Sequence, residues 1–96
     1  MYIYINLTKE RRYIKMTHTI TIKIWDKKDQ LITNKRVQIV DEYVTDSKIS
    51  IPFDERVFQL LQEDTTYEIT VDWAPVAIYK TYKSGKWLVI DYHGGK

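Results

Sequence analysis

The segment THTITIKIW, residues 17–25, decides the fold, because apolar and polar side chains alternate along its length. Ile20, Ile22 and Ile24 fall on one side of an extended chain, and threonine and lysine side chains fall on the other. Isoleucine and threonine are both favoured in strands. The period of two predicts a strand with one face in a core and the other toward solvent.

Similar alternation on both sides of this segment predicts an all-β protein. The residues from 26 to 36 are predicted to be a charged turn, and the KSG stretch at 83–85 is predicted to close a hairpin. The apolar parity shifts near Asp41, which predicts a bulge there. Besides 17–25, we expect strands over residues 2–7, 36–44, 48–53, 66–73, 76–82 and 86–92. In the strand over 66–73 the side chains expected to point inward are Tyr67, Ile69, Val71 and Trp73.

One segment departs from this alternation. In DERVFQLLQED, apolar residues recur at helical spacing behind Asp54, a suitable N-cap, so a short helix is predicted over residues 55–63. No further helices are expected to serve as crossovers between parallel strands. The sequence therefore predicts an antiparallel β-sandwich of about seven strands, either prealbumin-like or immunoglobulin-like.

Length and composition favour a single domain over residues 1–96, with residues 1–15 as an edge strand or an N-terminal arm and Met16 as an alternative start. The chain has no cysteine, which excludes disulfides and thiolate metal sites. A formal charge of +2 is not the footprint of a nucleic-acid-binding domain. The N-terminus lacks the pattern of a secretory signal, so we expect an intracellular or virion-associated protein with no membrane contact.

The segment TTYEITVDWAP, residues 65–75, places Tyr67, Ile69, Ala74 and Pro75 on the Y-x-L-x-E-x-x-A-P string common in collagen-adhesin B-type repeats. Together with the order of the surrounding strands, this resembles the prealbumin-like sandwiches of those repeats. The resemblance implies a binding or structural domain. It does not extend to the intramolecular isopeptide of such repeats, because Val71 stands at the position of the assisting acid.

Catalytic and metal-binding chemistry have few residues to use. The chain has two histidines, His18 and His93, near opposite ends of the sequence, and its serines lie in strand or turn contexts. General acid–base catalysis needs titratable side chains that converge in a cleft, and no such group is visible in the sequence. We therefore expect no enzyme activity, no cofactor and no metal.

Aromatic residues make up 14% of the chain, more than one small core needs. Segment 86–92 has apolar side chains on both faces, which predicts a protein-binding surface supplied by Tyr79, Tyr82, Trp87 and Tyr92. Residues expected to form a second contact are Tyr2, Tyr4, Arg11, Arg12 and Tyr13.

These observations favour a non-catalytic protein-binding module whose partner is another protein or a second copy of the chain. A small virus-encoded protein that docks on a larger protein fits this architecture, as a virion decoration subunit or as an inhibitor of a host defence enzyme. Two alternatives remain open. Exposed tryptophan and tyrosine could bind carbohydrate, and the KERRYIK segment, residues 9–15, could bind nucleic acid.

Overall fold

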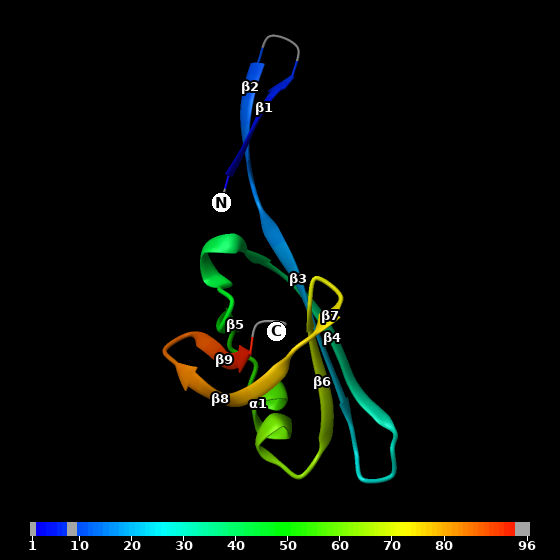
Figure 1. Cartoon of the computed structure of the whole chain (residues 1–96). Coiled ribbons are helices and arrows are strands. Elements are labelled where there is room, and N and C mark those ends of the chain that lie inside the picture. Colours follow the sequence, from blue (N-terminus) through cyan, green and yellow to red (C-terminus); the bar gives the residue numbers. More distant parts are fainter. Residues whose placement is uncertain (1, 8–9, 94–96) are drawn as a thin grey trace.

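The computed structural model describes residues 2–7 and 10–93, and side chains from Met16 to His93. It is an antiparallel β-sandwich with an N-terminal hairpin that projects from it (Figure 1). In chain order the described elements are β1 (Tyr2–Leu7), β2 (Glu10–Lys15), β3 (Thr17–Trp25), β4 (Leu31–Val40), the 3-10 turn η1 (Asp41–Tyr43), β5 (Lys48–Pro52), α1 (Glu55–Gln62), β6 (Thr66–Val71), β7 (Ala74–Pro75), β8 (Ala77–Ser84) and β9 (Trp87–His93).

The sandwich has a four-stranded first sheet in the order β4-β3-β6-β7 and a three-stranded second sheet in the order β5-β9-β8. All of their strand pairs are antiparallel, as the absence of crossover helices in the sequence predicts. The all-β sandwich with one short helix is thus confirmed. Its seven strands differ from the expected set in one respect, because β7 joins the first sheet while residues 2–7 pair outside it.

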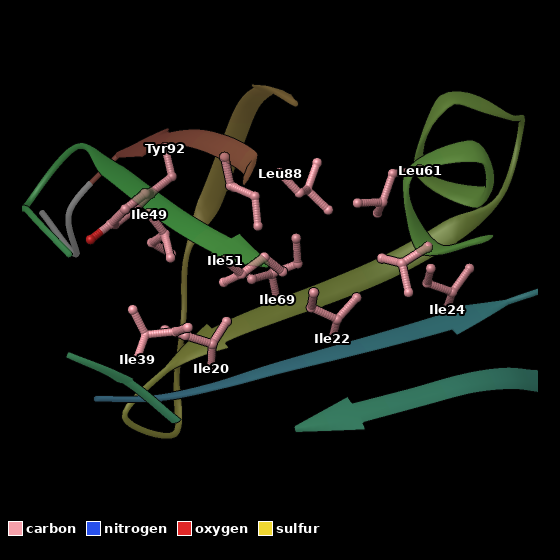
Figure 2. Packing of buried hydrophobic residues seen from close by; sticks show 12 residues of the cluster. Ile20, Ile22, Ile24, Ile39, Ile49, Ile51, Leu61, Ile69, Leu88 and Tyr92 are labelled. Atoms are coloured by element: carbon pink, nitrogen blue, oxygen red, sulfur yellow. The ribbon is translucent and has the colours of Figure 1, made fainter. Parts of the chain in front are cut away.

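The core lies between the two sheets and is built mainly of isoleucine (Figure 2). Ile20, Ile22 and Ile24 of β3 are fully buried, as their alternation predicts. Each such side chain contributes about 1.5 to 3 kcal/mol by leaving water. Ile69 of β6 lies beside Ile22 in the same sheet. The core is completed from β5, α1 and β9 by Ile49, Ile51, Val57, Leu61, Leu88, Ile90 and Tyr92.

Strand β4 differs from its prediction at both ends. It begins at Leu31, so the turn after β3 is short, and the Asp26 carboxylate stabilises this turn by accepting hydrogen bonds from the backbone N–H groups of Lys28 and Gln30. The predicted bulge near Asp41 is wrong, because β4 ends at Val40 and the chain enters η1. Register shifts occur instead after Ile24 in β3 and between Ile78 and Lys80 in β8.

Helix α1 confirms the predicted cap. The Asp54 carboxylate accepts a hydrogen bond from the backbone N–H of Val57 at 3.1 Å, and its other oxygen lies 2.6 Å from the Lys35 ammonium. The bond from Lys35, followed by the backbone bond from Val57, lowers the pKa of Asp54 below its ordinary value. Val57 and Leu61 then face the core from the helix.

Strand β6 ends at Val71, earlier than predicted, and Trp73 does not point inward. Val71 pairs with Ala74 across a two-residue turn in which Asp72 and Trp73 both have positive φ, 50° and 74°. This is the backbone of a type I′ turn, which normally selects asparagine and glycine. The Trp73 side chain is 62% exposed, with the Arg36 guanidinium 4.8 Å from its ring centroid.

The predicted C-terminal hairpin is present, with its turn at residues 85–86 instead of 83–85. Ser84 pairs with Trp87, so Gly85 and Lys86 form a two-residue turn. Gly85 has φ of +60°, which glycine adopts without strain. This turn connects β8 directly to β9, the central strand of the second sheet.

The N-terminal hairpin forms an arm. Among the described strands, β1 and β2 pair with each other and with no strand of the sandwich. In Figure 1 β2 runs through Met16 into β3, and the hairpin extends the molecule to 56 Å along its longest axis. Nothing is described of the side chains expected to form the second contact, those of Tyr2, Tyr4, Arg11, Arg12 and Tyr13. No helix within the described residues is long and apolar enough to cross a bilayer.

Candidate functional site

The outer face of the second sheet is the candidate site. Along β9, Leu88, Ile90 and Tyr92 enter the core, and the alternate residues therefore lie on the opposite face. In register beside them on this outer face are Ser50 from β5 and Tyr82 from β8, which flank Val89. A sheet face toward solvent is usually polar, so the residues gathered here call for an explanation.

Four aromatic side chains and a histidine lie on this face, which we term the aromatic face; its rings belong to Tyr43, Tyr79, Tyr82, Trp87 and His93. Trp87 packs against Tyr43 of η1, with ring centroids 4.7 Å apart. Tyr79 packs against His93, with centroids 4.0 Å apart and the tyrosine oxygen 3.0 Å from Nδ1. Both pairs have the tilted geometry that aromatic rings favour.

The register shift in β8 explains how Tyr79 comes to this face. Ile78 pairs with Tyr92 and Lys80 pairs with Asp91, so Tyr79 is the extra residue of a bulge. Its ring consequently lies against His93 of β9, and 65% of Tyr79 is exposed. A bulge in an edge strand thus presents the most exposed tyrosine of the described side chains.

Charged side chains lie among the rings. The Asp91 carboxylate lies 3.9 Å from the ammonium groups of both Lys48 and Lys80, and its buried Oδ1 has no hydrogen-bond partner within the described part of the chain. The Lys80 ammonium also lies 5.3 Å from the centroid of Tyr82. Pairs at this distance on a surface are weak, so the lysines remain available to a partner.

The structure separates Tyr92 from the other three predicted contact residues. Tyr92 is 4% exposed and packs in the core, and its hydroxyl donates a hydrogen bond to the carbonyl oxygen of Thr45. Burial, followed by the nearby charges of Asp46 and Asp72, raises its pKa. Its parity with Leu88 and Ile90 is the sequence signal for this burial. Tyr92 therefore does not belong to the aromatic face.

The sequence pattern did not predict two members of the aromatic face, Tyr43 and His93. Tyr43 was placed in a strand, and its position beside Trp87 depends on η1, for which the sequence offers no clear signal. His93 was considered for metal or catalytic chemistry and lies against Tyr79 instead. Two further exposed rings among the described side chains belong to the first sheet: Trp73 lies on the β6–β7 turn, and Tyr67, predicted to point inward, is 37% exposed in β6.

Apart from the aromatic face, His18 forms a polar cluster with Asp41 and Asp72 that the sequence pattern did not predict. Its Nδ1 lies 2.5 Å from Asp72 and its Nε2 lies 2.7 Å from Asp41, so the ring joins β3 to η1 and to the β6–β7 turn. Hydrogen bonds to Asp41 and then Asp72 raise the pKa of His18 and outweigh burial. The bond from His18 lowers the pKa of Asp41. Burial would raise the pKa of Asp72, yet bonds from His18 and the Thr19 N–H lower it.

This cluster is suited to structure more than to catalysis. Both ring nitrogens of His18 are engaged by carboxylates, so neither is free to take a proton from a substrate. An open cavity of about 380 Å³ lies elsewhere, lined by Asp26, Lys27, Ile32, Leu60, Glu63, Asp64 and Thr65. It contains no histidine or serine. Searching the described residues reveals no group of three or more side chains able to hold a metal ion.

Comparisons of the chain with models of protein families, with curated proteins and with solved structures found no match.

Proposed function

We propose that the chain is a non-catalytic protein-binding module and that its contact surface is the aromatic face. One observation carries this proposal: Tyr79, Tyr82 and Trp87 gather with Tyr43 on the solvent side of a sheet whose other side is buried in the core. Tyrosine and tryptophan supply large contact areas with few rotatable bonds and are enriched among residues that dominate binding energy.

The charges on this face favour a partner with an apolar centre and an acidic rim. Lys48 and Lys80 flank one carboxylate, that of Asp91, so the charge among the rings is positive. An acidic partner residue would complement either lysine, and a partner N–H group would satisfy the buried oxygen of Asp91. The module we propose is a small virus-encoded protein, either a virion decoration subunit or an inhibitor of a host defence enzyme.

The proposal is tested by capture on the immobilised full chain from a native lysate, with the identified partner then titrated by calorimetry. The double variant Tyr79→Ala/Tyr82→Ala should weaken binding at least about tenfold, equivalent to about 1.4 kcal/mol. Trp73→Ala is the matched control, because it removes an exposed ring from the other sheet and should leave affinity unchanged. Equal loss in both variants, or in neither, contradicts the proposal.

The same variants decide between a protein and the two other ligand classes. Stacked rings beside lysines also suit single-stranded nucleic acid, and exposed rings with polar neighbours suit carbohydrate. Fluorescence anisotropy with a labelled oligothymidine and a glycan array should show no binding that depends on Tyr79 and Tyr82. Binding that disappears in the double variant would replace the protein partner with that class of ligand.

A further inference from the structure

The edge strands of the sandwich are protected from pairing with another chain. In β4, an edge of the first sheet, Lys35 pairs in register with Ile22 and so lies on the core-facing side, where its ammonium contacts Asp54. A charge directed inward from an edge strand opposes the addition of a further strand. The other edge of this sheet, β7, has two residues.

The second sheet is protected by different means. Its β8 edge contains the bulge between Ile78 and Lys80 and has a further lysine at Lys83. Its β5 edge spans five residues and ends in Pro52. Bulges, lysines, proline and short length all discourage edge-to-edge pairing. Each of the named edge strands β4, β7, β5 and β8 therefore carries at least one such feature.

Strand β1 carries none of them. Its sequence, YIYINL, contains no charged residue, proline or glycine, and every residue in it except Asn6 is apolar or aromatic. It pairs along one side with β2 and has no described partner on the other. A two-stranded hairpin is marginally stable in water, and a third or fourth strand would stabilise it.

We propose that β1 pairs antiparallel with β1 of a second copy of this chain, forming a four-stranded sheet in the order β2-β1-β1-β2. The pairing is symmetric, so one six-residue strand supplies both sides of the contact. The alternative contact through β2, ERRYIK, would bring Arg11 and Arg12 beside the arginines of the second copy. Like charges on adjacent strands are destabilising, which favours β1 at the centre.

The direction of the arm strands determines where the two sandwiches of this dimer would lie. Because β1 of one copy runs antiparallel to β1 of the other, the two β2 strands also run in opposite directions. Each β2 leads into its own β3, so the two sandwiches lie at opposite ends of the shared sheet (Figure 1). The dimer therefore makes no use of the aromatic face.

Cysteine cross-linking distinguishes the two possible contacts, since the chain has no cysteine of its own. Tyr4 pairs with Tyr13 and Ile5 with Arg12, so each β1 position has a matched β2 control. In the twofold-symmetric pair only the β1 residue on the axis lies opposite its own copy, one strand spacing away, about 4.8 Å. Equivalent positions of β2 lie at least three spacings apart, about 14 Å. A disulfide requires Cα atoms within about 7 Å.

Tyr4 and Ile5 are the two central residues of β1, so one of them is expected to lie at the axis. We expect oxidation of the full chain to cross-link at least one of Tyr4→Cys and Ile5→Cys into dimers and to leave both Tyr13→Cys and Arg12→Cys as monomers. Cross-linking through the β2 cysteines alone would overturn the proposal. So would a chain that sediments as a monomer at every concentration, because the partner strand would then have to come from another protein.

Sedimentation of a second matched pair measures the strength of the contact. Ile3 pairs with Ile14 in the hairpin, so Ile3→Lys and Ile14→Lys add the same charge to β1 and β2. Ile3→Lys should weaken dimerisation at least about tenfold and Ile14→Lys less than about threefold, because only the first charge sits in the central strand pair. Equal effects of the two variants would overturn the proposal. The variant Tyr79→Ala/Tyr82→Ala should dimerise normally, which separates this test from that of the proposed function.

Discussion

The outer faces of the two sheets differ in how many of their polar side chains hydrogen-bond to one another. On the first sheet, Thr17 donates a hydrogen bond to Gln38, Gln38 donates to Thr19, and the hydroxyls of Thr21 and Thr70 bond to each other. On the second sheet the corresponding positions hold rings, lysines and a carboxylate oxygen without a hydrogen-bond partner among the described residues. These side chains of the first face bond to one another, and the second face has groups that a partner can satisfy.

This difference shows that burial alone does not identify a binding surface. Thr21 and Thr70 lie on an outer face and are nevertheless 6% and 8% exposed, since they fill the space between neighbouring strands. Tyr79 lies on the other outer face and is mostly exposed. The aromatic face is distinguished by exposed ring area beside a carboxylate oxygen that has no hydrogen-bond partner among the described residues, which is why we assign binding to it.

The largest expected effect separates the two faces of β9. Tyr92→Ala should lower the free energy of unfolding by about 3 to 5 kcal/mol, because it removes a buried ring from the core. Tyr79→Ala, on the outer face, should change it by less than about 0.5 kcal/mol. Urea unfolding followed by circular dichroism measures both. Similar losses in the two variants would mean that the faces are not energetically distinct.

The next effect concerns the polar face. Thr21→Val should lower the free energy of unfolding by about 1 to 3 kcal/mol, because it leaves the Thr70 hydroxyl buried without its partner. Adding Thr70→Val should restore much of this loss, since no unpaired hydroxyl then remains. A double variant as unstable as the sum of the single variants would show that the two hydroxyls act independently.

A smaller effect is expected on the aromatic face. In a double-mutant cycle, Tyr43→Ala and Trp87→Ala should show a coupling energy of about 0.5 to 1.5 kcal/mol, the usual value for a pair of aromatic rings. Denaturant unfolding of the four proteins gives this value. Zero coupling would indicate that the rings are independent in solution and that the face is less preorganised for binding than its geometry implies.

The smallest effect is the pH dependence of the His18 cluster, which is partly exposed. Protonated His18 stabilises the fold, because its pKa is raised in the folded state. This contribution is complete at a pH below the ordinary pKa of 6.5 and is lost as the pH rises through the raised pKa. The lowered pKa values of Asp41 and Asp72 stabilise it above 3.8, and this is lost as pH falls through the lowered values.

The cluster should therefore contribute most between about pH 4 and 6.5. Thermal melts of the unaltered chain and of His18→Gln, compared at each pH, isolate this contribution from other titrating groups. Their melting temperatures should differ most in that window and converge at higher pH. A constant difference from pH 5 to 9 would contradict the assignment.

Much of the fold could be predicted because the deciding signals are local. The alternation around Ile22 and the cap at Asp54 each act within a few residues, and both are seen as expected. Strand ends were less predictable: Trp73 continues the alternation of β6 in sequence while the backbone already turns at Asp72.

The candidate site was partly predictable for the same reason. Tyr79, Tyr82 and Trp87 could be identified as surplus aromatic residues, whereas the side of β9 on which Tyr92 lies was ambiguous, because both sides carry apolar residues. His18 and its partners are separated by 23 and 54 residues, and only the sheet topology brings them together.

The contact between Lys35 and Asp54 links helix capping to the resistance of the protein to aggregation. One carboxylate both caps α1 and neutralises the lysine that keeps the ten-residue edge strand β4 from acting as a template. Losing it would weaken the helix and remove the contact that holds Lys35 inward along the longest edge strand of the sandwich. We therefore expect Asp54→Ala to accelerate fibril formation on heating, measured by thioflavin T fluorescence, beyond what its loss of stability explains. The same side chain thus begins a helix and positions the lysine of an edge strand.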